Sequence, residues 1–300
     1  MAAEVSIPLD TPQGRHTVRA VYHRQGSGTP LLLLHGIGHH WQAWQPVLPA
    51  LAEQHDVIAL DLPGFGRSPA LPPGVSYELG SVVPLLGRLC TELDIERPHV
   101  AGNSLGGLLA LELGRRGLAR SVTALSPAGF WKPWERRYAF ALLLAMRFGA
   151  RTLPPALVGR LATGPGGRAL LLGSIYAHPG RRTPAEAEAE TAALRGAAGF
   201  GPTLAAGRNV RFTGDVPAVP VTLGWGSADR LLLPRQAERA LREMPGARLV
   251  RLPGCGHVPM SDGPALVAET VLSTCALADS AAVDQAAADQ AGAAEAAAQG

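Results

Sequence analysis

Cysteine is scarce in this 300-residue sequence, which contains only Cys90, Cys255 and Cys275. These three residues lie far apart, and no two of them have the C-x-x-C spacing of a zinc site or a redox pair. Isolated cysteines of this kind fit a reducing compartment. The sequence therefore predicts no cysteine-based metal or redox chemistry.

Long apolar runs are also missing. The longest, at residues 31–34 and 139–146, are much shorter than the roughly 18 residues that a membrane-spanning helix needs. The N-terminal segment contains Glu4, Asp10 and Arg15 and lacks the continuous apolar stretch of a secretory signal peptide. We therefore expect a cytoplasmic protein without a membrane span.

Lysine is almost absent, since Lys132 is the only one and nearly all the positive charge is arginine. The formal net charge is +3, and the arginines are scattered between acidic residues. A nucleic-acid-binding face needs its cations clustered on one surface. The sequence therefore favours a small-molecule partner over nucleic acid, and it leaves open whether the protein is a monomer or a homodimer.

Apolar residues, in contrast, are abundant: 47% of the sequence is hydrophobic, which suits one α/β domain with room for an insertion. In the first half, apolar runs typical of buried strands alternate with helical patterns. This alternation predicts right-handed crossovers and a mostly parallel sheet. The expected elements are a hairpin of strands 5–9 and 17–23, strands at 31–34, 56–60, 98–101 and 122–126, and helices at 41–51, 77–93 and 108–113.

The pattern changes after residue 129, because no strand recurs until about residue 212. We interpret residues 129–212 as an inserted helical cap between two parts of one core, at 1–128 and 213–278. The Ala-rich residues 279–300 offer no apolar face, so we expect a frayed or disordered tail. The expected elements are cap helices at 138–148, 154–161 and 185–194, core strands at 219–225 and 248–252, and core helices at 234–243 and 264–277.

The sequence Gly102-Asn103-Ser104-Leu105-Gly106 has the G-x-S-x-G pattern of a nucleophile elbow. In this strained strand-to-helix turn, the backbone at Ser104 takes a left-handed conformation, and neither Gly102 nor Gly106 has room for a side chain. The turn would present the Ser104 hydroxyl at the tip of the sheet. The alternative is an idle serine in an ordinary structural turn.

A serine hydroxyl needs a base within hydrogen-bond reach, and that base needs a third group to orient it. Asp229 and His257 each follow one of the last two predicted strands. Because parallel strands end at the same edge of a sheet, Ser104, Asp229 and His257 should converge there. Asp215 precedes its strand and His178 falls in the predicted cap, so both are weaker candidates. Asp229 as a turn residue and His257 as a packed loop residue are the alternatives.

Four stretches in this order resemble the α/β-hydrolase fold superfamily, in its branch with a helical cap, over about residues 5–277. The resemblance implies an α/β fold with a mostly parallel, eight-stranded sheet, helices on both faces and an inserted helical cap. The stretches are the oxyanion-loop-like His35-Gly36-Ile37-Gly38, the D-x-x-G-x-G-x-S turn at residues 61–68, the elbow, and the G-x-x-D and G-H segments that hold Asp229 and His257.

The resemblance also implies roles for single residues. Ser104 attacks an acyl carbon, His257 accepts and later returns its proton, and Asp229 orients His257. The backbone N–H groups of Ile37 and Leu105 are assigned to an oxyanion hole, with Gly36 or Gly38 as the alternative to Ile37. Further residues expected at the substrate are Gly36, Gly38, His40, Asn103, Trp131 and Trp134.

No metal or cofactor is expected. His39 and His40 are adjacent and point different ways, and no nearby side chain completes a ligand set, so a metal site is disfavoured. His35 is interpreted as a turn residue rather than a catalytic group. Cys255 fits a small apolar filler better than a redox-sensitive site.

Haloalkane dehalogenases and epoxide hydrolases of the resembled fold use aspartate at the elbow, so Ser104 argues against both reactions. The expected function is hydrolysis of an ester, thioester or lactone of a small, largely apolar substrate. Asn103 before the serine is similar to the elbow of meta-cleavage-product hydrolases, which makes cleavage of a C–C bond in a vinylogous diketone the first alternative. The second is a ligand-binding protein with slow or no turnover.

Overall fold

The computed structural model describes residues 2–11, 14–216 and 219–298, with side chains described as far as residue 281. Its strands form one eight-stranded sheet. They are β1 Ala2–Thr11, β2 Gly14–Gln25, β3 Thr29–Leu34, β4 His55–Leu60, β5 His99–Asn103, β6 Ser121–Leu125, β7 Val221–Gly226 and β8 Arg248–Leu252.

The strand order in the sheet is β1-β2-β4-β3-β5-β6-β7-β8. β2 runs antiparallel to both of its neighbours, and all pairs from β4 to β8 are parallel. Leu31 to Leu34 of β3 are fully buried, as expected for a central strand covered on both faces. The predicted mostly parallel sheet is therefore confirmed, and its parallel strands all end at one edge.

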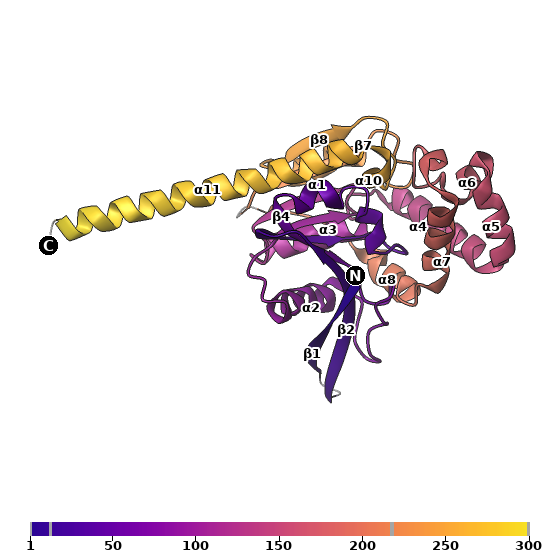
Figure 1. Ribbon diagram of the computed structural model, residues 1–300, viewed down its shortest axis with the longest axis horizontal. Coiled ribbons are helices and arrows are strands. Elements are labelled where there is room, and N and C mark those ends of the chain that lie inside the picture. The colour runs from indigo at the N-terminus through magenta and orange to yellow at the C-terminus, as the bar shows by residue number, and fades with distance from the viewer. Residues whose placement is uncertain (1, 12–13, 217–218, 299–300) are drawn as a thin grey trace.

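Helices cover both faces of this sheet (Figure 1). α2 and α3 lie on one face, and α1 and α11 on the other, where they contact each other. The core helices are η1 Trp41–Trp44, α1 Leu48–Ala52, α2 Leu79–Glu92, α3 Leu105–Arg115, α9 Gln236–Glu243, α10 Pro259–Asp262 and α11 Pro264–Ala298. The single helix predicted at 41–51 is divided into η1 and α1, because Pro46 and Pro49 interrupt the backbone hydrogen bonds of a continuous helix.

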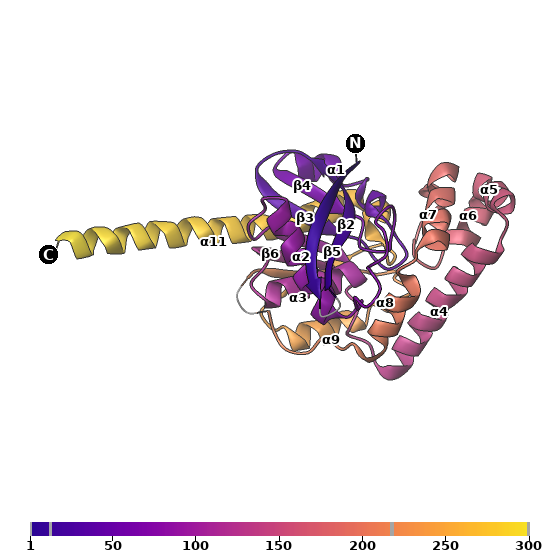
Figure 2. The same cartoon turned by 90° about the horizontal axis from the view of Figure 1, so that it is seen from below.

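The segment between β6 and β7 is helical and gathers at one end of the molecule (Figure 2). We call its members the inserted helices. They all fall within residues 129–212, and they include α6 and α8, which the sequence patterns did not predict. The inserted helices are α4 Pro133–Thr152, α5 Pro155–Thr163, α6 Pro165–Leu172, η2 Pro179–Arg181, α7 Pro184–Gly196, α8 Phe200–Ala206 and η3 Gly207–Asn209.

A helix that spans a membrane must be both long and apolar. Within the described ranges, no single helix is long and apolar enough to cross a bilayer. α4 and α5 meet the requirement of length and composition only as a pair, and the pair is bent by 109°.

The last helix is longer than the sequence patterns predicted. α11 was expected to end near residue 277, and its backbone continues as helix to Ala298, projecting away from the sheet in both views (Figures 1 and 2). Alanine has the highest helix propensity, so this composition favours continuation. Residues 299–300 lie outside the described residues, and the disorder expected for 279–300 stays a prediction.

Candidate active site

Ser104 occupies the sharp turn between β5 and α3. Its backbone has φ 57° and ψ −112°, the positive φ that the elbow pattern predicts. A Cβ at Gly102 would lie 2.0 Å from the carbonyl oxygen of Gly106, and one at Gly106 would lie 2.1 Å from that of Leu34. Glycine is therefore required at both positions by close backbone approach.

His257 and Asp229 meet at the same edge of the sheet. Nδ1 of His257 lies 2.9 Å from Oδ2 of Asp229, and both side chains are buried. The other carboxylate oxygen of Asp229 accepts the N–H groups of Leu231 at 2.9 Å and Leu232 at 2.8 Å. Because a carboxylate only accepts, Nδ1 carries the proton and Nε2 is left as an acceptor.

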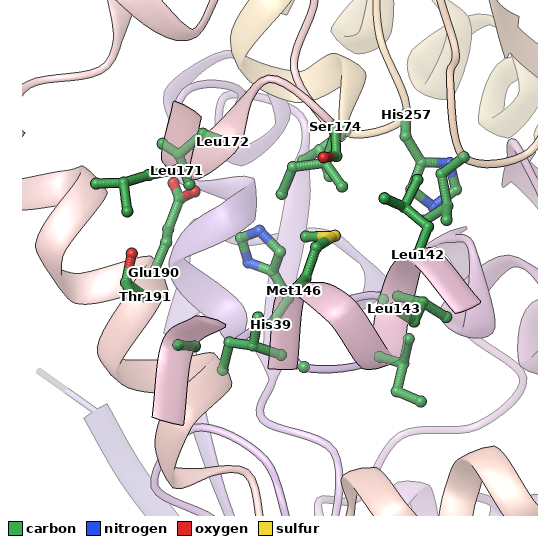
Figure 3. Close-up of a pocket in the computed structure, with 18 of the residues that line it drawn as sticks. His39, Leu142, Leu143, Met146, Leu171, Leu172, Ser174, Glu190, Thr191 and His257 are labelled. Atoms are coloured by element: carbon green, nitrogen blue, oxygen red, sulfur yellow. The ribbon is translucent and has the colours of Figure 1, made fainter. Parts of the chain in front are cut away.

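Ser104 and His257 both line a cavity of about 350 Å³ between the sheet edge and the inserted helices (Figure 3). In the described part of the chain, the Ser104 hydroxyl has no hydrogen-bond partner, so no hydrogen bond joins it to His257. Most of the cavity wall is apolar. Its apolar side chains include Leu142, Leu143, Met146, Leu171, Leu172 and Leu194.

A second, smaller apolar pocket of about 60 Å³ also reaches Ser104. Ile37, Ser104 and Leu143 belong to the walls of both spaces, whereas Leu105 and Trp131 line only the smaller one. Ser104 therefore lies at the junction of a large and a small apolar compartment.

The loop after β3 is held by His35. Its Nδ1 donates to the carbonyl oxygen of Gly36 at 2.7 Å, and its Nε2 accepts the N–H of Leu62 at 3.0 Å. Burial lowers the pKa of His35 to about 4, so the ring is neutral and structural, as expected. Over the residues described, the N–H groups of Ile37 and Leu105 have no hydrogen-bond partner. For Leu105 the reason is its place in the first turn of α3, where backbone donors lack intrahelical acceptors.

The structure brings two further side chains to the His257 loop. Asp262 accepts the N–H groups of Gly256 at 2.8 Å, Ala177 at 2.8 Å and His178 at 2.9 Å, which ties this loop to the inserted helices. Asn103 donates its side-chain N–H to the carbonyl oxygen of His257 at 2.8 Å. Sequence reasoning missed Asp262 entirely, because a lone aspartate after a Pro-Met-Ser segment carries no recognisable pattern.

The other residues expected at the substrate do not all line the same cavity. Gly36, Gly38 and Asn103 line the large cavity. His40 lines a separate polar cavity, and burial lowers its pKa to about 4. Trp134 lines none of these cavities: its indole is 48% exposed and lies under the Arg235 guanidinium.

Cys255 lies beside the His257 loop and is 1% exposed. Burial raises the pKa of its thiol to about 11, so the reactive thiolate is disfavoured. This environment supports the interpretation of Cys255 as a filler.

The sequence of this chain is similar to those of known proteins. The family described as "Alpha/beta hydrolase family" matches residues 31–270. An uncharacterized protein of Mycobacterium tuberculosis is 31% identical over 274 residues, covering 85% of this chain and 78% of that protein. The epoxide hydrolase EphH of the same organism is 34% identical over 200 residues, covering 62% of this chain and 89% of that protein.

A similar solved structure is an esterase from Thermogutta terrifontis, with a TM-score of 0.72 and 20% identity. The alignment covers 92% of this chain and 99% of that chain. At this level of identity the likeness concerns the fold alone.

Proposed function

Because this chain belongs to the alpha/beta hydrolase family, we propose that it is a serine hydrolase that cleaves an ester, thioester or lactone through an acyl-enzyme on Ser104. The observation that carries the proposal is the 2.9 Å contact between His257 Nδ1 and Asp229 at the wall of the cavity that Ser104 also lines. A binding protein would not need a base with its own orienting carboxylate beside the serine.

The proposed first step is attack of Ser104 Oγ on the acyl carbon. His257 Nε2 removes the hydroxyl proton as the new C–O bond forms, and Asp229 stabilises the resulting imidazolium. The unpaired N–H groups of Ile37 and Leu105 are the proposed donors to the oxyanion. Hydrogen bonds between catalytic groups often form only when substrate is bound, which accounts for the absence of a hydrogen bond from the Ser104 hydroxyl to His257.

The proton then passes from His257 to the departing alcohol or thiol, and the C–O or C–S bond of the substrate breaks. Water, deprotonated by the same imidazole, hydrolyses the acyl-enzyme and restores Ser104. We assign the inserted helices as the cap that covers these steps, since α4 and α7 contribute much of the cavity wall. The large and small compartments beside Ser104 would take the two sides of the scissile bond.

Epoxide opening is disfavoured by the chemistry of the nucleophile, despite the likeness to an epoxide hydrolase. Attack of Ser104 on an epoxide carbon would form an ether, and neither the neighbouring base nor water could hydrolyse it. An aspartate nucleophile forms an ester, which water can cleave. The alternative of C–C hydrolysis rested on Asn103. The hydrogen bond of Asn103 to the His257 carbonyl oxygen gives this residue a structural role that does not require that reaction.

The test is labelling by a fluorophosphonate probe, which reacts with activated serines. We expect covalent attachment at Ser104, read by peptide mass spectrometry, and its loss in His257→Ala. His178→Ala is the matched control, because His178 is exposed and lines neither compartment beside Ser104. Persistent labelling of His257→Ala would contradict the activation mechanism. A panel of p-nitrophenyl esters, thioesters, lactones and vinylogous diketones then assigns the bond that is cleaved.

A further inference from the structure

One wall of the large cavity is polar, and the proposed hydrolysis makes no use of it. His39, from the loop after β3, and Glu190, from α7, both line the cavity. Figure 3 shows these two side chains toward one side of the cavity and Leu142 and Leu143 toward the other. We call His39 and Glu190 the polar wall.

Glu190 is held by a buried network. Its Oε1 accepts from the guanidinium of Arg182 at 2.5 Å and from the hydroxyl of Tyr176 at 3.0 Å. Arg182 also donates to the hydroxyl of Ser261 at 2.9 Å. The position of the carboxyl group is therefore set from outside the cavity, and Arg182, which also lies 3.2 Å from Glu186, supplies a positive charge beside Glu190.

The direction of the hydrogen bonds determines what His39 offers. Because Tyr176 gives its proton to Glu190, its oxygen can only accept from Nε2 of His39, which lies 3.4 Å away. The imidazole is neutral, since burial lowers the pKa of His39 well below its ordinary value. Nδ1 of His39 is then left without a proton and acts as an acceptor.

Two acceptor atoms of the polar wall have no partner. Among the described residues, neither Oε2 of Glu190 nor Nδ1 of His39 makes a hydrogen bond, although the two residues are only 6% and 8% exposed. Buried polar atoms are normally hydrogen-bonded, because leaving one without a partner destabilises the folded protein. A ligand group that donates hydrogen bonds to these atoms, after a small rotation of the two side chains toward the cavity, would remove that destabilisation.

We propose that the polar wall binds a hydroxyl group of the substrate, so that the preferred substrates are esters or thioesters of hydroxylated aliphatic acids. This assignment rests on the proposed function of Ser104. A hydroxyl suits the wall better than an ammonium group because Glu190 already has a cationic partner in Arg182, and the apolar remainder of the cavity fits an aliphatic chain. The neighbouring Thr191 does not compete, since its hydroxyl donates to the carbonyl oxygen of Ala187 at 2.8 Å.

The test separates binding from turnover by using Ser104→Ala. Calorimetry would compare methyl octanoate with its 3-, 5- and 8-hydroxy derivatives. We expect at least one hydroxy ester to bind about tenfold or more tightly than methyl octanoate, which corresponds to one hydrogen bond. Combining Ser104→Ala with His39→Phe, which removes one acceptor without changing charge, should abolish the preference.

Glu190→Gln in the same background is the second variant, because its amide oxygen can keep the contact with Arg182 and turn the NH₂ toward the cavity. It should also abolish the preference, while Thr191→Val, on the same helix, should preserve it. Equal binding of all four esters to Ser104→Ala, or a preference that survives both polar-wall variants, would overturn the hydroxyl subsite. Neither result bears on fluorophosphonate labelling of the wild-type protein, so failure of the subsite and failure of the proposed function are distinguishable.

Discussion

His257 is fixed by contacts on both sides of its peptide, in addition to the contact of its ring with Asp229. Asn103 binds its carbonyl oxygen, and Asp262 binds the N–H of the preceding Gly256. Gly256 also has no room for a side chain, because a Cβ there would lie 2.6 Å from the backbone nitrogen of Ala177. The orientation of the imidazole relative to Ser104 therefore depends on residues outside the proposed catalytic set.

Asp262→Asn tests this dependence at a single residue. The carboxylate accepts three N–H groups, whereas an amide would turn its NH₂ toward at least one of them, so the loop should shift. We expect kcat for a p-nitrophenyl ester to fall about tenfold or more and the free energy of unfolding to fall by about 1–3 kcal/mol. Asp215→Asn, at an exposed position that lines none of these cavities, is the matched control. Unchanged kcat in Asp262→Asn would rule out this positioning role.

At the scale of elements, the elbow depends on β5, α3 and β3 approaching one another at backbone distance. Gly106→Ala would place its Cβ 2.1 Å from the Leu34 carbonyl oxygen, so strand and helix would have to separate. We expect the variant to lose about 3 kcal/mol or more of stability and all labelling at Ser104. Gly80→Ala, at the start of α2 with no atom within 4 Å of the added Cβ, should be neutral or slightly stabilising. Equal urea midpoints for the two variants would contradict the close approach.

The first part of α11 packs against the core. Its described buried residues include Val267, Val271, Cys275 and Ala278, and Asp279 lies 3.2 Å from Arg120 and from His99. We expect removal of residues 282–300 to leave the melting temperature and the proposed esterase activity unchanged, because these contacts are all retained. Removal from residue 274 onward should lower the melting temperature, since buried Cys275 and Ala278 are lost. A large loss of stability from the shorter deletion, measured by thermal unfolding, would show that the tail is part of the fold.

At the scale of the whole molecule, several buried histidines and two buried carboxyl groups oppose each other as the pH changes. Burial lowers the pKa values of His35, His40 and His99 to about 4 and that of His39 well below its ordinary value. These rings are neutral in the folded protein at pH 5 and protonated in the unfolded chain, so their contribution to stability is lost as pH falls below about 6.5. Burial raises the pKa of Glu190 to about 7, which makes a contribution of opposite sign.

Four histidines outweigh the two carboxyl groups, those of Glu190 and Asp61, whose pKa values burial raises. We expect the free energy of unfolding to fall by about 2 kcal/mol or more between pH 7 and pH 5, measured by urea titration at each pH. Glu190→Gln should make the fall steeper, because the protonation that favours the folded state at low pH is removed. A midpoint that is constant or rises toward pH 5 would show that these histidines are charged in the folded protein.

The sequence alone determined the sheet and the chain order of the proposed catalytic residues. Buried strands such as 31–34 are visible as apolar runs, and the elbow is visible because two close backbone contacts demand Gly102 and Gly106, which flank Ser104 at fixed spacing. Asp229 and His257 could be placed because parallel strands end at the same edge. These are local patterns or direct consequences of chain order.

Only the tertiary structure decided what surrounds Ser104. The hydrogen bond of Asn103 to the His257 loop joins two parts of the core, and Trp134 lies at an exposed face. The contacts of Asp262 and the link from His39 through Tyr176 to Glu190 depend on how the inserted segment packs. Their contacts join residues that are far apart in the chain, such as His39 and Tyr176. Such contacts follow no periodicity in the sequence, because they arise from the docking of one helical segment onto the sheet edge.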